Sequence, residues 1–263
     1  MLGSIIGNLY HKLIGKLFGV EAIVQERVVR ELEARVPGLV SAEITGILQG
    51  SSEPRMVFDV EKVANVLAAV SSGQYFLKHM LLAEKLVDRE ALIRFSIEKC
   101  AIDGLVMEFG VYAGQSLRVI AGCMPQIVYG FDSFQGLPED WTRHQKKGRF
   151  DLEGKMPRFE EKNVRLVPGW FEETLPTFLS QISGPVRFLH MDCDLYTSAA
   201  TVFTHLGPRI VSGTVIVFDE YFNYPGWEQH EFRAFQEFVT SRELKYSYLG
   251  FASGYPSVAV RIN

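Results

Sequence analysis

The chain has 263 residues, of which 47% are hydrophobic and 22% are charged, and its net charge is −4. This apolar content supplies a sizeable core and excludes a largely disordered chain. The negative charge argues against nucleic acid as a partner, because phosphate backbones attract basic surfaces. Three widely spaced cysteines (Cys100, Cys123 and Cys193) match neither a disulfide framework nor a zinc motif, which favours a reducing, cytoplasmic location.

Residues 1–103 are predicted to form a helical N-terminal extension or cap. Apolar residues recur at helical spacing in the first 17 residues and again in 61–70 and 75–101. No apolar run reaches the roughly 20 residues of a membrane-spanning helix, and we expect neither a signal peptide nor stable membrane insertion. The first helix either lies on a membrane surface or packs on its own domain or a partner subunit. We favour packing, and with it a homo-oligomer.

Residues 104–263 are predicted to form an α/β domain. Short apolar runs at 105–110, 127–132, 164–167, 186–192 and 214–220 alternate with amphipathic helical stretches. This alternation indicates a mostly parallel sheet with helices on both faces, which binds ligands at the carboxyl ends of its strands. The last two runs, 244–251 and 255–262, have no helix between them, so they predict a terminal hairpin with an antiparallel strand.

Acidic residues follow four of these apolar runs. They are Glu108, Asp132, Asp192 and the pair Asp219 and Glu220. A single Asp after a strand is often a helix N-cap. Acids at the ends of four strands of one parallel sheet instead predict an acidic edge.

A glycine turn follows the first strand, with Gly110 and Gly114 in a GxxxG spacing. Glycines there let a ligand approach the backbone, and the next helix offers free N–H groups. Because Glu108 precedes the turn, a pyrophosphate would be repelled, whereas an ammonium or sulfonium would be attracted. The turn therefore favours S-adenosylmethionine over a nicotinamide cofactor. Asp132 suits the ribose of either one.

The third strand leads to Gly169 and Trp170. These residues either flank an adenine base, with the indole against it, or Trp170 belongs to the core at a helix start.

Four segments together resemble a known family. "MEFGVYAGQSL", "GFDSFQGLPEDW", "FLHMDCDLYTS" and "TVIVFDEY" occur in this order in 75–263 and are similar to the macrocin O-methyltransferase (TylF/MycF-like) family of class I methyltransferases. The resemblance implies a Rossmann-like, mostly parallel seven-stranded sheet with an antiparallel terminal strand, and S-adenosylmethionine as cofactor. The cofactor-binding residues that it implies are Glu108, Gly110, Gly114, Ser116, Asp132, Ser133, Gly169 and Trp170.

The resemblance also implies Mg²⁺, with ligands at the matching positions Asp192, Asp219 and Glu220. The family more often has Asp at the last of these positions. Methyl transfer to a hydroxyl needs a base or a cation that lowers the pKa of the hydroxyl, and carboxylates suit a hard cation. Asp192 is expected to be a metal ligand and catalytic base. His144, in a polar segment that resembles a lid, is either a second base or a solvated histidine.

The segment that contains Asp192 also carries Cys193 and Asp194. Alternation along a strand places the two aspartates on one side and the thiol on the other, so Cys193 is interpreted as packing. Asp194 is interpreted as an N-cap or support of the next helix.

The predicted function is methylation of a hydroxyl of a small-molecule acceptor, either a sugar or a phenol, in natural-product biosynthesis. Aromatic residues at 221–227 are expected to wall the acceptor pocket, and those at 232, 235 and 238 to be core. Two alternatives remain: a nicotinamide-dependent oxidoreductase, and a catalytically silent binding domain of the same fold.

Overall fold

The computed structural model describes residues 59–263. Two compact units divide between Leu81 and Leu82. The described part of the first unit is helix α2 (Val60–His79), which begins at Asp59; the side chain of Asp59 accepts hydrogen bonds from the backbone N–H groups of Glu61 and Lys62 at 3.1 and 3.3 Å. The helix expected at the start of the chain lies outside the described residues. The domain boundary after residue 103 stays a prediction.

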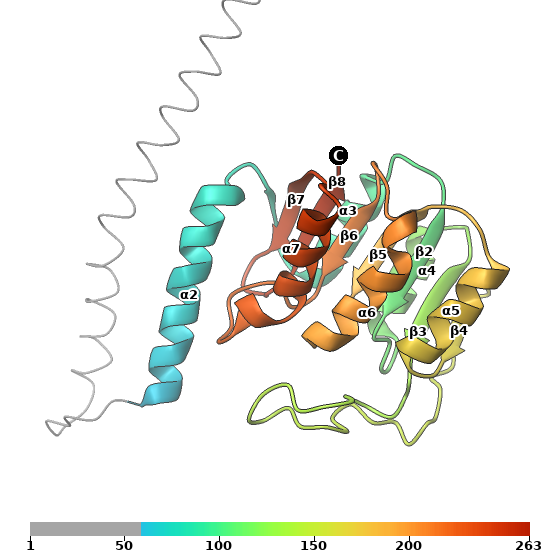
Figure 1. Cartoon of the computed structure of the whole chain (residues 1–263), viewed down its shortest axis with the longest axis horizontal. Helices are drawn as coiled ribbons and strands as arrows, with labels where there is room; N and C mark the ends of the chain where they lie inside the picture. Colours follow the sequence, from blue (N-terminus) through green and yellow to red (C-terminus); the bar gives the residue numbers. More distant parts are fainter. Residues whose placement is uncertain (1–58) are drawn as a thin grey trace, which may run out of the picture. The chain divides into compact units, whose positions relative to one another are not determined.

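The second unit contains a sheet of eight strands (Figure 1). In chain order the strands are β1 (Glu84–Leu86), β2 (Leu105–Phe109), β3 (Val128–Asp132), β4 (Val164–Pro168), β5 (Val186–Met191), β6 (Val215–Phe218), β7 (Tyr246–Ala252) and β8 (Val258–Ile262). Their spatial order is β1-β7-β8-β6-β5-β2-β3-β4. Strand β8 is antiparallel to β6 and β7, and the other pairs are parallel. The predicted fold class is confirmed, although the sheet has eight strands and not the seven that the family resemblance implies.

Helices cover both faces of the sheet. Helices α3 (Arg89–Glu98) and α4 (Gln115–Cys123) lie on one face, and α5 (Phe171–Gln181), α6 (Tyr196–Leu206) and α7 (Glu231–Ser241) lie on the other (Figure 1). Two short 3-10 helices, η1 (Gly207–Arg209) and η2 (Trp227–Gln229), complete the unit. Within residues 59–263, no helix has both the length and the apolar character that crossing a bilayer requires.

Alternate residues of the strands pack against opposite helix layers. Phe131 contacts Phe178 of α5 at a ring-centroid distance of 5.0 Å, and Phe218 contacts Phe235 of α7 at the same distance. Strand residues of the opposite parity, such as Val106, join the α3 and α4 side chains in one buried cluster. Because side chains alternate along a strand, this parity places Glu108 on the α3/α4 side of the sheet.

Strand β1 interrupts the helical pattern that the sequence predicts over most of residues 59–103. The pairing of Glu84 to Leu86 with residues 250–252 of β7 makes it the edge strand of the sheet. The run has no apolar alternation of its own, so its conformation depends on the distant partner strand. The helical pattern resumes after Asp88, whose carboxylate accepts the N–H of Ala91 at 2.8 Å and caps α3.

The sheet changes its direction of winding at β2. Its neighbours are β3 on one side and β5 on the other, so the chain continues to one side and later returns to the other. Such a switch point opens a crevice at the carboxyl ends of the strands, where open α/β sheets bind their ligands.

Candidate active site

The turn between β2 and α4 brings backbone close to backbone at the switch point. Gly110 has φ 89°, and a Cβ there would lie 1.7 Å from the carbonyl oxygen of Asp192. Gly114 has φ 78° and is the N-cap of α4, and a Cβ there would lie 2.4 Å from the ring of Phe159. Both positions therefore require glycine, as the spacing in the sequence predicts.

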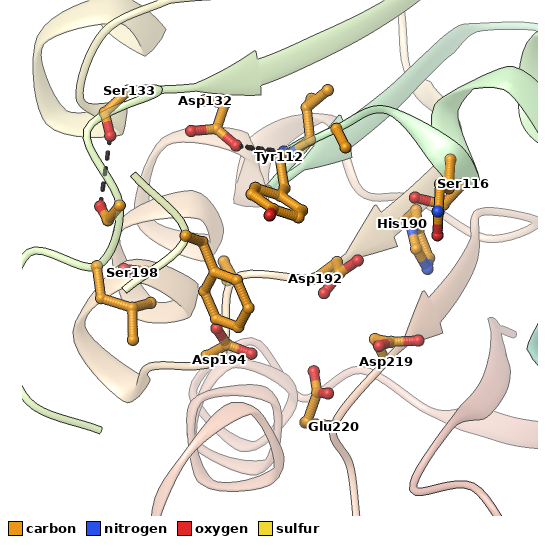
Figure 2. A pocket seen from close by; sticks show the side chains of 18 of the residues that line it. Tyr112, Ser116, Asp132, Ser133, His190, Asp192, Asp194, Ser198, Asp219 and Glu220 are labelled. Carbon is orange, nitrogen blue, oxygen red and sulfur yellow. Dashed lines mark hydrogen bonds between the residues drawn. The ribbon is translucent and has the colours of Figure 1, made fainter. Parts of the chain in front are cut away.

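Asp132 holds this turn from the end of β3. Its Oδ2 accepts the backbone N–H groups of Val111 and Tyr112 at 2.8 and 2.7 Å, and its Oδ1 accepts that of Phe134 at 2.7 Å. A carboxylate offers about four acceptor sites. Three are occupied here, so about one remains for a ligand hydroxyl (Figure 2).

Four carboxyl groups converge at the ends of β5 and β6: Asp192, Asp194, Asp219 and Glu220 (Figure 2). Asp192 belongs to two overlapping groups of side chains whose ligand atoms lie within 4.8 Å of one another. The first group adds His190 and Asp219, and the second adds Asp194 and Glu220. The three expected metal ligands are thus divided between two groups that share Asp192.

The cluster is electrostatically strained. Burial, followed by repulsion from Asp219, raises the pKa of both Asp192 and Glu220 well above the usual value for a carboxyl group. Burial also raises the pKa of Asp194 to about 7, although a hydrogen bond with Glu220 works in the opposite direction. A bound cation would relieve this repulsion. The oxygen donors, together with the unpartnered buried Oε2 of Glu220, therefore fit a divalent cation.

Two further groups set the charge and shape of this edge. The guanidinium of Arg89, at the start of α3, forms an ion pair with Asp219, and Ser257 donates to the other carboxylate oxygen of Asp219 at 3.2 Å. Glu231, fully buried at the start of α7, accepts the backbone N–H groups of Cys193 and Asp194 at 3.1 and 3.2 Å. Glu231 thereby fixes the turn that follows Asp192.

Cys193 and Asp194 follow Asp192 in this turn, and the sequence predicted a structural role for each. The buried thiol of Cys193 donates a hydrogen bond to Glu231 at 3.7 Å and belongs to neither group of potential metal ligands, and its interpretation as packing stays a prediction. Asp194 does not cap α6, because the N-cap position belongs to Leu195 and has no side-chain hydrogen bond. Asp194 instead takes a left-handed backbone conformation with φ 62°, which turns its carboxyl group toward Glu220.

A cavity of about 1240 Å³ joins the glycine turn to the acidic edge. It lies within the second unit, and the predicted site residues that line it are Gly110, Gly114, Ser116, Asp132, Ser133, Trp170, Asp192, Asp219 and Glu220. Gly169 and Glu108 lie behind the lining. The N–H of Gly169 donates to the carbonyl of Asp132 at 2.9 Å, and Glu108 contacts His190.

The segment that was expected to form a lid lines part of this cavity. It contributes Glu139, Trp141, Gln145 and Phe150. His144 is exposed and lies outside the lining, and its role stays a prediction.

The aromatic residues at 221–227 occupy different positions from those expected. Tyr221, Phe222 and Trp227 are buried, and Tyr221 packs against Phe218 at 5.1 Å. The aromatic side chains that line the cavity come from other parts of the unit. They are Tyr112, Trp141, Phe150, Trp170, Phe171 and Tyr255. The expectation rested on the position of residues 221–227 directly after the acidic pair, but Tyr221, Phe222 and Trp227 turn into the core instead.

Sequence reasoning missed Arg89, Glu231 and the role of His190. His190 had a usable signal, because it precedes Asp192 by two positions and alternate strand residues share a side. Arg89 and Glu231 reach the site from helices that begin far away in the chain, and no local pattern indicates them.

Comparison with known proteins decides the family. The sequence model described as Macrocin-O-methyltransferase (TylF) matches residues 76–247. The chain belongs to this methyltransferase family. The match runs from the last turn of α2 to the start of β7 and includes the glycine turn and the acidic edge.

Curated relatives of this TylF-family chain are named as O-methyltransferases. One, from Streptomyces olivaceus, is an 8-demethyl-8-(2,3-dimethoxy-alpha-L-rhamnosyl)-tetracenomycin-C 4'-O-methyltransferase; it is 28% identical over 54% of this chain and 62% of its own length. Another, the mycinamicin III 3''-O-methyltransferase of Micromonospora griseorubida, is 26% identical over 62% of this chain and 73% of its own length. The chain thus spans about three fifths of the first relative.

Solved structures share the fold. The O-methyltransferase NovP superimposes with a TM-score of 0.53 at 22% identity, covering 66% of this chain and 78% of that protein. A calicheamicin methyltransferase superimposes with a TM-score of 0.52 at 21% identity, covering 85% of this chain and 91% of that protein. Both comparisons support the same sheet architecture.

Proposed function

We propose that this TylF-family chain is an S-adenosylmethionine-dependent O-methyltransferase that acts on a small-molecule hydroxyl with the help of a divalent cation. The observation that carries the proposal is a single cavity in which the glycine turn of the family meets a cluster of carboxyl groups. The turn can bind a cofactor. The acids can bind a cation, and one of them can accept a proton.

The residues around the turn are proposed to bind the cofactor. Asp132 has about one acceptor site left for a ribose hydroxyl, and Ser133 and Trp170 line the cavity beside it. Gly114 and Ser116 line the cavity at the start of α4, where the first turn of a helix has N–H groups without intrahelical partners. Bound there, S-adenosylmethionine supplies a methyl group on a positively charged sulfur.

Asp192 is proposed to accept the proton of the acceptor hydroxyl. Asp192 lines the cavity at the end of β5, between the glycine turn and the other acids of the edge, and a carboxylate placed beside a hydroxyl can act as a general base. As the proton moves to Asp192, the acceptor oxygen forms a bond to the methyl carbon and the bond from carbon to sulfur breaks. The products are a methyl ether and neutral S-adenosylhomocysteine, so charge and atoms balance.

Asp192, Asp219 and Glu220 are the proposed holders of the cation, which we take to be Mg²⁺. A cation bound there supplies positive charge that lowers the pKa of a nearby hydroxyl. These three carboxyl groups would hold the cation at the carboxyl ends of β5 and β6.

The proposed acceptor is a hydroxyl of a sugar or of a glycosylated or phenolic natural product. The names of the relatives support a sugar, and the aromatic lining formed by Tyr112, Trp141, Phe150 and Tyr255 offers flat apolar surfaces to a sugar ring or a phenol. A cytoplasmic homo-oligomer remains part of the proposal.

The proposed role of Asp192 is tested with Asp192→Asn. Turnover with S-adenosylmethionine and a panel of rhamnosylated acceptors should fall by about 10²-fold or more, because the base is lost. The affinity for S-adenosylhomocysteine, measured by calorimetry, should be unchanged. Asp140→Asn is the matched control, because Asp140 is exposed, pairs with Lys146 and lies outside the cavity lining. Full turnover of Asp192→Asn would remove Asp192 from the mechanism.

A further inference from the structure

His190 lies buried beneath the acidic edge with one ring nitrogen engaged and the other without a partner. Its Nδ1 is 2.7 Å from Oε1 of Glu108, and the two side chains are 1% and 0% exposed. Its Nε2 is buried and has no hydrogen-bond partner among the described residues. A buried polar atom without a partner costs free energy, so it calls for a ligand that would satisfy it.

The imidazole of His190 has two carboxylate neighbours besides Glu108. One ring nitrogen of His190 lies within 4.8 Å of an oxygen of Asp192 and an oxygen of Asp219, and His190 itself lines the cavity. Ligands that bind one cation at about 2.1 Å each lie at most about 4.2 Å apart. A small side-chain adjustment would therefore bring all three atoms to one ion.

Glu108 fixes which nitrogen faces the carboxylates. Glu108 and His190 are register partners on the neighbouring strands β2 and β5, so the backbone holds their side chains together. A carboxylate at Nδ1 keeps the proton of a neutral imidazole on that nitrogen and leaves the Nε2 lone pair free to bind a metal. Glu108 does not line the cavity, and its side chain makes its direct contact with the site through His190.

We propose that His190, oriented by Glu108, is a nitrogen ligand of the cation site and acts together with one carboxylate each from Asp192 and Asp219. The inference deepens the metal-assisted part of the proposed function and rests on it. An imidazole ligand raises the affinity of a site for first-row transition ions, so we expect Mn²⁺ to bind at the proposed Mg²⁺ site. Glu108 is then a positioning residue of the metal site.

The opposing interpretation is a purely structural pair, in which Glu108 and His190 only tie β2 to β5. That interpretation predicts a cation held by oxygen atoms alone, or no cation at all. It also predicts that substitutions at these positions change stability without changing the ligands of a bound ion.

The test is a titration of the full-length, cofactor-free protein with Mn²⁺, followed by electron paramagnetic resonance and electron spin-echo modulation. We expect modulation from a directly bound ¹⁴N nucleus in the unmodified protein. His190→Gln should abolish this modulation and weaken Mn²⁺ binding by more than 10-fold. Glu108→Gln should keep the modulation and weaken binding by about 10-fold, the usual effect of losing a partner of a metal-bound histidine.

His205→Gln is the matched control, because His205 lies in the last turn of α6, outside the cavity lining. Binding of S-adenosylhomocysteine checks that each variant is folded. Mn²⁺ binding without nitrogen modulation in the unmodified protein would overturn the role of His190 and leave the metal-assisted function standing. An absence of Mn²⁺ binding would overturn both, and methyl transfer in EDTA would then show whether the enzyme works without a metal.

Discussion

At the scale of single residues, Arg89 brings a positive charge to an edge that otherwise carries carboxyl groups. Burial works to lower the pKa of its guanidinium, but the contact with Asp219 outweighs this effect and raises it. The charges of Asp192 and Glu220 add to the increase. Arg89 is half exposed and lies 5.8 Å from the ring of Tyr255, so it has room to move away from the edge. It therefore competes with a cation for Asp219.

Replacing Arg89 should tighten cation binding. In Arg89→Gln the carboxylate of Asp219 loses its partner, and the dissociation constant for Mn²⁺ should fall by up to about fivefold, the value of a partly exposed ion pair. Calorimetric titration measures this change. Arg94→Gln is the control, because Arg94 lies on the same helix and pairs with exposed Glu90. Weaker binding in Arg89→Gln would show that Arg89 supports the site instead of competing for it.

At the scale of structural elements, the start of α4 depends on a left-handed glycine. Gly114 begins the helix at φ 78° and faces the ring of Phe159, whereas Gly122 lies inside the same helix with nothing within 4 Å of an added Cβ. The two glycines therefore have opposite sensitivities to the same substitution.

Gly114→Ala should lower the free energy of unfolding by at least about 1–2 kcal/mol, the cost of the left-handed conformation alone. Gly122→Ala should raise it by about 0.5–1 kcal/mol, because alanine loses less entropy than glycine in a helix. Urea denaturation of both variants measures the difference. Equal effects of the two substitutions would contradict the proposed geometry of the turn.

The polar segment 140–150, which was expected to form a lid, contacts the 220–230 region through packed rings. The indole of Trp141 packs edge-on against Tyr224 at 5.9 Å and against His230 at 6.2 Å. Burial lowers the pKa of His230, against the opposing charge of Glu139. Because its folded-state pKa lies below the unfolded value, the stability that His230 contributes is present above about pH 6.5 and is lost as the pH falls through the lowered folded-state pKa.

The free energy of unfolding should therefore fall more in the unmodified protein than in His230→Gln between about pH 7.5 and pH 5. The raised pKa of Asp194 acts in the opposite direction, since it stabilises the fold as the pH falls, but it is present in both proteins and cancels in the difference. Denaturation at several pH values measures the effect. Parallel pH profiles of the two proteins would show that His230 titrates no differently in the folded and unfolded chains.

At the scale of the whole molecule, the sheet and most of its site edge follow from the sequence. Continuous apolar runs that end in acids predict β2, β3, β5 and β6 and the side of the sheet where they end, because parallel strands share a carboxyl edge. The features that the sequence does not predict depend on contacts between segments that are distant in the chain. Strand β1 forms only against β7, and the pairing of Glu108 with His190 depends on the register of β2 and β5. Arg89 joins Asp219 across 130 positions of the chain.

The proposed activity requires, before any chemistry, that the cavity prefer the methylation cofactor to a nicotinamide. Calorimetric titration of the full-length protein with S-adenosylhomocysteine and, separately, with NADH measures this preference most directly. We expect saturable binding of S-adenosylhomocysteine and no binding heat from NADH, because the carboxyl groups of the acidic edge disfavour a pyrophosphate. Binding of NADH without binding of S-adenosylhomocysteine would contradict the proposed function.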